Sequence, residues 1–308
     1  MLKVYCVIAC YNNLKWVDSC LGSLKKSEHP IHIIIVDDAS TDGSREFIKK
    51  NYPEVQLIES DQNNGFSAAN NRGILKAIEQ GADYLLLLNM DAWIEPDTVT
   101  VLLRIAESNP DYGIISPMHM NGAGTALDYL FSTYLEPKKC PELYSDIYTG
   151  NTEEIYPIHS VNAAAWFVRS DIFKKIGLLD ESFFMYGSDD NFVDRVKYYG
   201  YKVGVTPATN IFHDREHRIP DINNIKTDYQ KQINRMKVIA FNPNCTSSDK
   251  IFLLFRKSMS DFIRNLKSMN ILSALKNINV LIYGVYFSIR HKDRHRELKN
   301  QMQLSINA

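Results

Sequence analysis

The sequence lacks the features that mark several specialised classes of protein. With 14 glycines and 11 prolines among 308 residues, it is neither low-complexity nor collagen-like. Its five cysteines form no Cys-x-x-Cys pair and no zinc-type Cys/His spacing, so reduced and mostly buried thiols are expected. Gly-x-Gly-x-x-Gly and Gly-x-x-x-x-Gly-Lys-Ser/Thr motifs are also absent, which leaves Rossmann dinucleotide and P-loop sites without support.

Targeting and membrane-spanning signals are missing as well. Met1-Leu2-Lys3-Val4 passes straight into an apolar run, without a charged leader or a cleavage site. The apolar segment 272–289 is interrupted by Asn277 and Asn279 and is too short to cross a bilayer, which takes about 20 apolar residues. We therefore expect a cytoplasmic protein.

Net charge is close to zero but unevenly distributed. Residues 249–308 carry 11 Lys and Arg against 4 Asp and Glu, a net of +7, so the overall charge of -1 leaves -8 on the remainder. Apolar residues interleave with these cations, and this pattern favours a membrane surface over nucleic acid. Peripheral contact with the cytoplasmic face of the inner membrane, a homodimer contact, or packing on the rest of the chain all remain open.

Hydrophobic periodicity predicts an α/β fold with a helical C-terminal region. Strands are expected at 4–10, 31–36, 55–59 and 84–88, alternating with helices at 14–26, 44–51 and 66–80, an order that indicates a parallel sheet. Further strands are expected at 114–116, 159–168, 202–206 and 210–212, and further helices at 96–108, 170–176 and 189–199. Residues 118–157 show no clear period and are interpreted as a variable loop region over the site. From residue 221 the pattern is helical, with helices at 221–240, 247–267 and 272–291.

Polar residues follow three of the expected strands. They are Tyr11-Asn12-Asn13, the segment 37–44, and Asn89-Met90-Asp91. The carboxyl ends of parallel strands meet in one crevice, so these side chains are expected to share a site. Asp91 offers the hard oxygen ligand that Mg²⁺ or Mn²⁺ prefers. The other interpretation, that Asn89 and Asp91 only form a turn, stays open.

Five motifs in this order resemble the inverting family 2 glycosyltransferases, in particular the bacterial rhamnosyltransferase type. The motifs are Cys10-Tyr11-Asn12, the segment Val36-Asp37-Asp38-Ala39-Ser40-Thr41-Asp42-Gly43-Ser44, Asn64-Gly65-Phe66 through Asn70-Asn71-Arg72-Gly73, Leu88-Asn89-Met90-Asp91, and Leu179-Asp180-Glu181-Ser182-Phe183-Phe184-Met185-Tyr186-Gly187. Together they cover about residues 3–215. The resemblance implies the GT-A nucleotide-diphospho-sugar transferase fold, a mostly parallel central sheet with flanking helices. It divides the chain into a catalytic domain over 1–220 (nucleotide-binding half 1–116, acceptor and catalytic half 117–220) and a C-terminal helical region over 221–308.

The resemblance also implies roles for particular residues. The nucleotide-sugar site would comprise Tyr11, Asp37, Asp38, Asn70, Arg72, Asn89, Met90 and Asp91. Asp37 and Asp38 would lie at the nucleoside, and Asn70 and Arg72 near the ribose and diphosphate. Asp91, with Asn89 at the first position of the Asp-x-Asp-type motif, would hold Mn²⁺ or Mg²⁺ together with His213.

The general base implied by the resemblance is Asp189. Ser188 stands where the family has a Glu, and Asp190 either replaces that Glu in part or is an ordinary acidic residue of a first helical turn. The expected reaction is metal-dependent inverting transfer of a hexose or deoxyhexose. The donor would be a UDP- or dTDP-sugar, and the acceptor a growing cell-surface polysaccharide, lipopolysaccharide (O-antigen) or other glycan, including lipid-linked glycans. Two rivals remain: a nucleotidyltransferase that makes nucleotide sugars, and a non-catalytic nucleotide- or glycan-binding protein.

Overall fold

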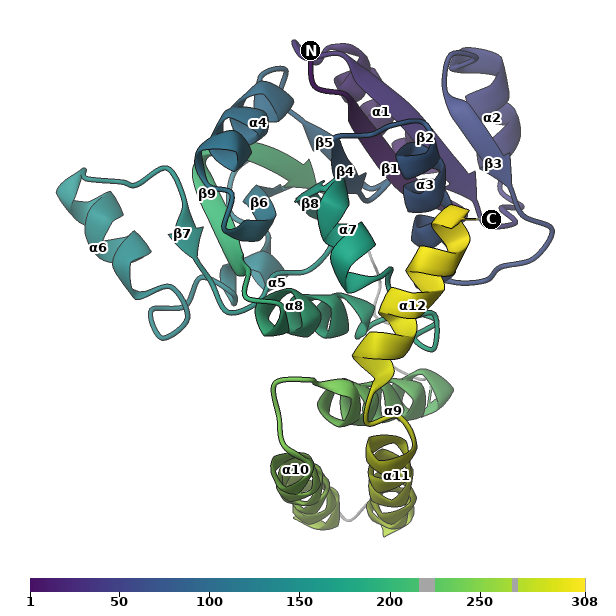
Figure 1. The fold of residues 1–308 in the computed structure, drawn as a ribbon, viewed down its shortest axis with the longest axis vertical. Coiled ribbons are helices and arrows are strands. Elements are labelled where there is room, and N and C mark those ends of the chain that lie inside the picture. The colour runs from purple at the N-terminus through teal and green to yellow at the C-terminus, as the bar shows by residue number, and fades with distance from the viewer. Residues whose placement is uncertain (216–224, 268–270, 308) are drawn as a thin grey trace.

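A computed structural model describes residues 1–215, 225–267 and 271–307 of the chain. Within these ranges a nine-stranded mixed sheet forms the centre of the molecule, and helices cover both of its faces (Figure 1). A group of helices from the C-terminal part lies below the sheet in the same view. The main strand order is β3-β2-β1-β4-β8-β6-β9-β5, with β7 paired to β9.

The first half of the sheet is parallel, as predicted. It contains β1 (Val4–Cys10), β2 (Ile31–Asp37), β3 (Gln56–Glu59) and β4 (Tyr84–Leu88), connected through α1 (Val17–Lys25), α2 (Ser44–Asn51) and α3 (Phe66–Glu79). Every residue of β4 is buried, which explains its unbroken run of leucines. The helix expected at 14–26 begins instead with a separate 3₁₀ turn, Leu14–Trp16.

The second half of the sheet contains antiparallel strands. It holds β5 (Ala92–Ile94), β6 (Tyr112–Asn121), β7 (Tyr156–Pro157), β8 (Ala165–Arg169) and β9 (Lys202–His213), with helices α4 (Thr98–Ser108), α7 (Ser170–Ile176) and α8 (Ser188–Tyr198). β8 runs antiparallel to β4 and β6, and β5 runs antiparallel to β9. The two strands expected at 202–206 and 210–212 are one strand, in which the register against β6 shifts after Thr206.

The segment 118–157 was expected to be an irregular cover over the site, and this expectation is wrong. β6 continues to Asn121, and the short helices α5 (Tyr129–Ser132) and α6 (Pro141–Thr149) follow. Phe131 and Leu143 are buried in the larger core, so the segment packs against the sheet. Aromatic residues at irregular spacing hide this packing from a periodicity search.

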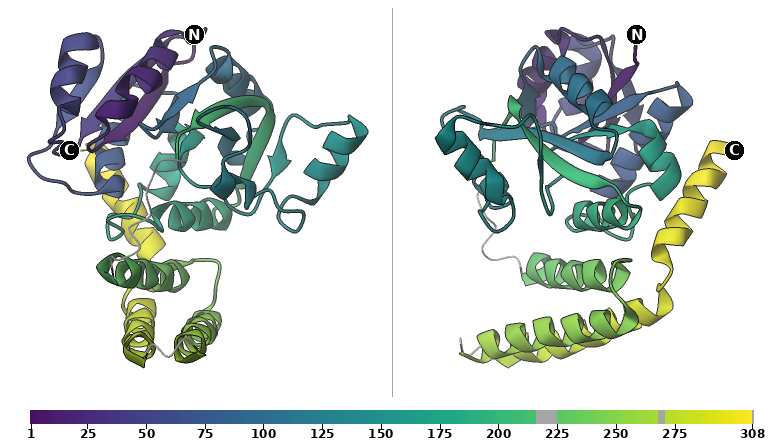
Figure 2. Two further views of the ribbon diagram at one scale, coloured as in Figure 1. Left: turned by 180° about the vertical axis from the view of Figure 1, so that it is seen from behind. Right: turned by 60° about the vertical axis from the view of Figure 1, so that its left-hand side comes forward.

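The C-terminal region consists of α9 (Ile225–Phe241), α10 (Ser247–Lys267), α11 (Ile271–Arg290) and α12 (Arg294–Asn307). The predicted domain boundary at 220 and 221 lies outside the described residues. α10 and α11 pair as a hairpin against α9, whereas α12, which the sequence pattern did not predict, returns along α7 and α3 (Figures 1 and 2). There Arg294 forms an ion pair of 2.7 Å with the buried Asp180, and Met302 joins the larger core. None of the described helices is both long and apolar enough to cross a membrane.

Candidate active site

A cleft of about 580 Å³ opens at the carboxyl ends of β1, β2 and β4 and at the start of α8. Six of the predicted site residues line it: Tyr11, Asp38, Asn89, Met90, Asp91 and Asp189. Side chains that were not among the predicted site residues also line it, including Phe66, Met185 and Tyr186 of the motifs and Trp16, Asn63, Asn162 and Arg215 outside them. No described residue of the segment 118–157 belongs to this lining. The crevice expected from the parallel strand ends therefore exists, with a floor from the first half of the sheet and a rim from α8.

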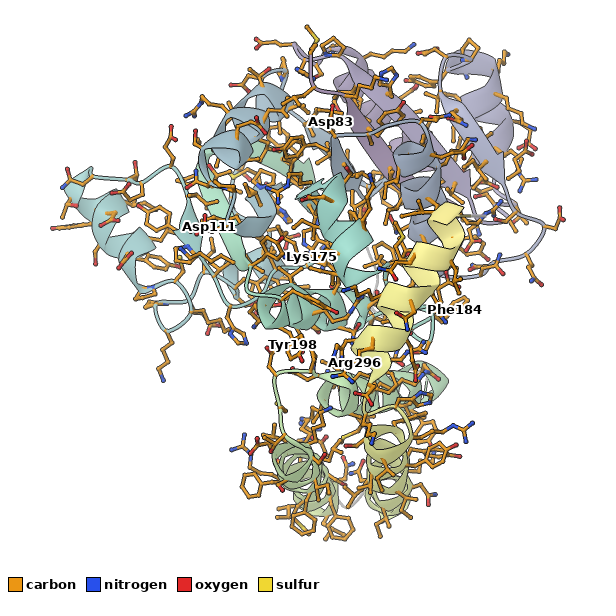
Figure 3. The ribbon with its side chains drawn as sticks, viewed as in Figure 1. Asp83, Asp111, Lys175, Phe184, Tyr198 and Arg296 are labelled. Carbon is orange, nitrogen blue, oxygen red and sulfur yellow. The ribbon has the colours of Figure 1, made fainter. Side chains whose placement is uncertain are left out.

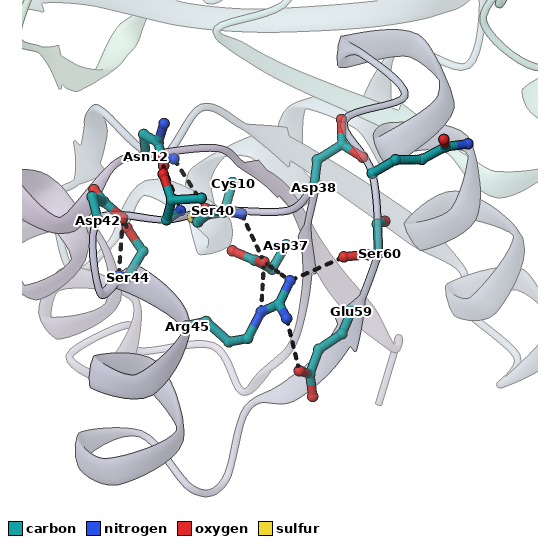
Figure 4. Close-up of polar contacts among 12 residues, drawn as sticks. Cys10, Asn12, Asp37, Asp38, Ser40, Asp42, Ser44, Arg45, Glu59 and Ser60 are labelled. Carbon is teal, nitrogen blue, oxygen red and sulfur yellow. Dashed lines mark hydrogen bonds and ion pairs between the residues drawn. The ribbon is translucent and has the colours of Figure 1, made fainter.

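The floor of the cleft is fixed where β1 and β2 end. Asn12 and Ala39 both adopt left-handed backbone conformations, with φ of 54° and 65°. The Asn12 N–H donates to Ser40 Oγ at 3.0 Å, and the Asn12 side-chain oxygen accepts from the Thr41 N–H at 2.8 Å (Figure 4). These bonds connect the two loops, so the polar strand ends form one rigid unit.

Asp38 organises the wall of the cleft opposite β1. Its carboxylate accepts hydrogen bonds from the backbone N–H groups of Asn64 and Gly65, at 2.9 and 2.8 Å. Gly65 has a φ of 87°, and a Cβ there would lie 2.3 Å from the Phe184 carbonyl oxygen. Only glycine fits this approach, which brings the loop 63–65 against the segment that precedes α8.

Asp37 lies behind the cleft and does not line it. Its fully buried carboxylate accepts from Arg45 Nε and Nη2 at 2.8 and 2.6 Å, and Arg45 also donates to the Ser60 carbonyl oxygen at 3.0 Å (Figure 4). This arrangement attaches α2 to the ends of β2 and β3. The predicted contact of Asp37 with the nucleoside therefore has no direct support from the geometry, and the side chain has a structural role.

Replacing Arg45 by Ala is expected to lower the free energy of unfolding by about 3 kcal/mol, because it leaves Asp37 as an uncompensated buried carboxylate. The figure lies at the low end of the usual range, since 23% of the Arg45 side chain is exposed. Urea denaturation measures the change. Lys49→Ala removes only a solvent-exposed partner of Glu59 and is the control, expected to cost less than about 1 kcal/mol. Equal losses in the two variants would contradict the structural role of Asp37.

Asn70 and Arg72 are also absent from the lining of the cleft. Asn70 is buried in α3 and its side-chain amide donates to the Phe66 carbonyl oxygen at 2.9 Å. Arg72 donates to Ser60 Oγ and to the Glu59 carbonyl oxygen. Neither side chain lines the cavity that Asp91 and Asp189 share, so the structure adds no support to their predicted contacts with ribose and diphosphate.

Asp91 and His213 are adjacent, although they are far apart in the sequence. β5 pairs with β9 so that Ala92 lies opposite His213, and this register places His213 Nε2 3.3 Å from Asp91 Oδ1. The other ring nitrogen, Nδ1, lies 3.3 Å from Asp128 Oδ2. All three side chains are buried, with Asp91 2% exposed at the edge of the cleft and His213 behind it.

The donor set fits a divalent cation of the Mg²⁺ or Mn²⁺ type. Adjacent ligands of an octahedral ion with bonds of about 2.1 Å lie about 3 Å apart, close to the separation of Asp91 Oδ1 and His213 Nε2. The described ranges contain no group of three or more His, Cys, Asp or Glu arranged to hold a metal. Asp91 and His213 would therefore supply two protein ligands and leave positions for phosphate oxygens and water, as Mg²⁺ sites do.

Asp128 is a site residue that the sequence did not reveal. Burial alone would raise the pKa of its carboxyl, but hydrogen bonds from His213 and the Phe131 N–H, together with the charge of Arg215, lower it to about 2. A carboxylate on Nδ1 fixes the ring orientation and leaves Nε2 facing Asp91. Asp128 lies just before α5, in the segment interpreted as a loop, so only the tertiary structure identifies it.

Arg215 supplies a positive charge at the cleft. Its Nε lies 3.1 Å from a nitrogen of the His213 ring and 3.4 Å from Asp128 Oδ2, and the side chain is part of the cleft lining. The neighbouring Asp214 accepts a 2.8 Å hydrogen bond from the indole N–H of Trp16, another cleft residue. The negative charge of Asp91, which follows β4, is therefore balanced at the cleft by the positive charge of Arg215, which follows β9.

Asp189 lies in the first turn of α8, facing the cleft. Burial raises the pKa of its carboxyl, and its Oδ1 accepts a hydrogen bond of 3.1 Å from the Asp190 N–H. Asp190 itself is exposed, accepts from Ser160 Oγ at 3.3 Å, and does not line the cleft. The placement matches an ordinary first-turn residue for Asp190, and it singles out Asp189 as the acidic group of α8 that reaches the cavity.

The C-terminal region holds the segment that leads into α8. Asn234 of α9 donates from its side-chain amide to the carbonyl oxygens of Met185 and Tyr186, at 2.8 and 3.1 Å. Tyr186 and Gly187 have left-handed φ values of 64° and 96°, which turn the chain sharply before the helix begins. The rim of the cleft thus depends on α9 for its position.

The mixed sheet, with a cleft at its parallel strand ends, has the architecture of the GT-A fold. Residues 5–177 match the family described as "Glycosyl transferase family 2", and the chain belongs to that family. The resemblance and the fold predicted from the sequence are confirmed.

Curated relatives are distant. The "Low-salt glycan biosynthesis hexosyltransferase Agl10" of Haloferax volcanii is 25% identical over 188 residues, which cover 59% of this chain and 58% of the relative. The "N-acetylglucosaminyl-diphospho-decaprenol L-rhamnosyltransferase" of Mycobacterium tuberculosis is 24% identical over 218 residues, 62% of this chain and 69% of the relative. The aligned region thus spans little more than half the length of the haloarchaeal protein.

Solved structures share the fold. Residues 1–349 of S. aureus TarS align with a TM-score of 0.60 at 16% identity, covering 98% of this chain and 92% of that one. GalNAc-T7 with UDP, GalNAc and Mn²⁺ aligns with a TM-score of 0.59 at 16% identity, covering 78% and 48%. At this identity the likeness establishes the architecture.

Proposed function

We propose that the protein is a metal-dependent, inverting glycosyltransferase that moves a sugar from a nucleoside diphosphate to a glycan acceptor. The observation that carries the proposal is the cleft itself, in which Asp91, backed by His213, and Asp189 of α8 face one cavity. Both relatives are named as hexosyl- or rhamnosyltransferases, and TarS has been solved with UDP-GlcNAc. A UDP- or dTDP-sugar donor is consistent with these names.

Each side chain has a definite task in the proposed reaction. Asp189 takes the proton of the acceptor hydroxyl as its oxygen attacks the anomeric carbon, and the bond to the diphosphate breaks with its electron pair leaving on the phosphate oxygen. A single displacement of this kind inverts the anomeric carbon. When bound at Asp91 and His213, Mn²⁺ or Mg²⁺ supplies positive charge to the departing diphosphate. Arg215, on the same side of the cleft, adds a second cation.

The local environment of Asp189 suits a base. Burial raises its pKa above the ordinary value of an aspartate, which makes the carboxylate a stronger proton acceptor than an exposed one. The partial positive charge at the start of α8 keeps the ionised form accessible. The family motif has a Glu directly before the base, and this chain has Ser188 there. Ser188 is buried, so a hydroxyl group replaces the second carboxylate of the motif.

Acceptor and cellular setting are proposed at a coarser level. The name of the mycobacterial relative includes a sugar linked to diphospho-decaprenol. By analogy, the acceptor class proposed for this protein is a lipid-linked or growing cell-surface glycan. We also propose that the chain is divided into a catalytic domain over 1–220 and a helical region over 221–308. The proposed location is the cytoplasm, at the membrane. A nucleotidyltransferase is disfavoured by the family match, and a non-catalytic nucleotide-binding protein remains the rival because of Ser188.

Calorimetric titration with UDP-, dTDP- and GDP-sugars, each with and without Mn²⁺, tests the proposal. One donor is expected to bind about tenfold more tightly when Mn²⁺ is present, since a cation held by Asp91 and His213 would offset the negative charge of the diphosphate. Product analysis after addition of glycan acceptors then separates transfer from binding alone. Absence of binding by every nucleotide sugar would overturn the proposal.

Asp128→Asn is expected to weaken Mn²⁺ binding about 10–100-fold, because the amide no longer fixes the His213 ring as a carboxylate does. Asn caps a helix as well as Asp, because its side-chain oxygen can also accept the hydrogen bond that the Phe131 N–H donates to Asp128, so α5 keeps its start. Mn²⁺ titration followed by electron paramagnetic resonance measures the affinity without turnover. An unchanged affinity, with an unchanged unfolding midpoint, would exclude the positioning role of Asp128.

A further inference from the structure

The hairpin of α10 and α11 carries an exposed apolar face that the proposed function leaves unexplained. On α10, Phe252 is 62% exposed, with Phe255 and Ile263 also exposed, and on α11 Ile282 and Ile289 are 62% and 69% exposed. The residues recur at helical spacing along each helix, so they form one stripe per helix. Figure 3 shows side chains of this hairpin, rings among them, projecting away from the sheet. We name these five residues, together with Tyr286, the hairpin face.

The opposite side of the hairpin is already packed. Leu254 of α10, Val280 of α11 and Met236 of α9 form a buried cluster. Ser258 Oγ donates to the Asn277 carbonyl oxygen at 2.9 Å across the helix pair, and Gly284 lies close to Leu254. The hairpin is therefore held by its inner side, and the hairpin face is left for a partner outside the described residues.

Charge around the hairpin face is of one sign. Asp261 is the only acidic residue between positions 250 and 290 of the sequence. It is buried, 3.2 Å from Lys257 Nζ and 2.7 Å from Arg264 Nη2, so it faces inward. Arg256 and Arg290 are exposed beside the apolar stripes. The outer surface thus combines apolar rings with two arginines, Arg256 and Arg290, for which the described part of the chain provides no ion pair.

We propose that the hairpin face docks on a lipid bilayer that contains anionic headgroups, with α10 and α11 lying in the plane of the interface. Helices with an aromatic apolar side and a cationic flank bind in this way. Tyr286 lies beside Arg290, whose guanidinium is 5.8 Å from its ring, and tyrosine is enriched at headgroup depth. A bilayer also complements the charge, whereas a symmetric pairing of two copies through this face would bring their arginines together.

The consequence for the active site follows from α9. This helix packs on the hairpin and also hydrogen-bonds the carbonyl groups of Met185 and Tyr186 at the rim of the cleft. A docked hairpin would therefore connect the membrane surface to the cleft rim through one helix. This consequence rests on the proposed function: where the acceptor is lipid-linked, docking keeps the enzyme and its acceptor on the same membrane surface.

Flotation of the full chain with vesicles tests the docking independently of catalysis. The protein is expected to float with phosphatidylcholine vesicles that contain phosphatidylglycerol, and less with phosphatidylcholine alone or at high salt. Phe252→Ser combined with Phe255→Ser is expected to lower the partition coefficient at least tenfold. Arg256→Gln combined with Arg290→Gln is expected to lower it about fivefold per charge, only for the anionic vesicles.

Matched controls separate this face from exposed apolar surface in general. Ile147→Ser combined with Tyr148→Ser removes two exposed apolar side chains of α6, 54% and 93% exposed, and should leave flotation unchanged. Light scattering checks whether each variant stays monomeric. The proposal is overturned if the wild-type chain does not float with anionic vesicles at low salt, or if the control and hairpin variants float alike. It is also overturned if light scattering shows that the phenylalanine substitutions convert a dimer into monomers. Donor binding is measured separately, so a failure of the transferase proposal would not be confused with a failure of docking.

Discussion

Asp189→Asn is expected to slow sugar transfer about 10²–10⁴-fold, the usual contribution of a general base. The amide has the size of the carboxylate but cannot accept the acceptor's proton, so the affinity for the nucleotide sugar should stay the same. Steady-state rates with a saturating donor, together with calorimetric donor binding, measure the two effects. Asp190→Asn is the matched control, expected to keep near-wild-type turnover because Asp190 does not line the cleft.

The pH dependence of the wild type gives the same assignment a second test. The base acts only when deprotonated, so the rate is full above the pKa of Asp189 and falls as the pH drops through it. Burial raises this pKa above the ordinary value of 3.8, so the acid limb of the rate profile should lie at higher pH than for an exposed aspartate. Loss of activity in Asp190→Asn with retention in Asp189→Asn would assign the base to the other residue.

Asp91→Asn is expected to abolish the enhancement of donor binding by Mn²⁺ and to lower turnover about 10²–10³-fold, the loss typical of removing one stabilising group for developing charge. The neutral amide is a poor ligand for a hard cation, although it fills the same buried space beside His213. Mn²⁺ titration with and without nucleoside diphosphate provides the measurement.

Asn89→Ala is the control for this substitution. Asn89 lines the same cleft, but a neutral side chain at the first position of the motif is expected to contribute little to cation affinity. A variant of Asp91 that binds Mn²⁺ and donor like the wild type would refute the metal assignment, and an equal loss in both variants would indicate general damage to the strand end.

The parallel half of the fold was readable from the sequence, and the antiparallel half was not. β1 and β4 have continuous buried apolar runs that fix both their existence and their bounds. Strand direction carries no such signature, so the antiparallel insertion of β8 between β4 and β6 follows only from the observed pairing. α12 was missed because its sequence is largely polar and contributes mainly Leu298 and Met302 to the interior.

The residues of the candidate site, like the strands, could be predicted from the sequence only in part. Tyr11, Asp38, Asn89 and Asp91 could be found because each follows a strand at one edge of the sheet, whereas Asp189 was predicted only from the resemblance to the family. Asp37 directly precedes Asp38 in the motif, and its burial against Arg45 depends on the packing of α2. Asp128 reaches His213 from a distant segment, a contact that local sequence does not reveal, whereas Arg215 follows His213 by two residues and its contact with the ring depends on how the chain turns after β9.

The return of α12 has a consequence for how this protein acquires its structure during synthesis. Asp180 is buried with Arg294 as its partner, and Met302 is part of the larger core. Until those late residues have left the ribosome, the part of the chain that contains the sheet exposes Asp180 without its arginine partner and an apolar gap, and α10 and α11 emerge before the gap can close. α12 therefore couples the closing of this gap to the prior appearance of the hairpin, and a chain cut short after α11 would lose stability in the part that contains the sheet.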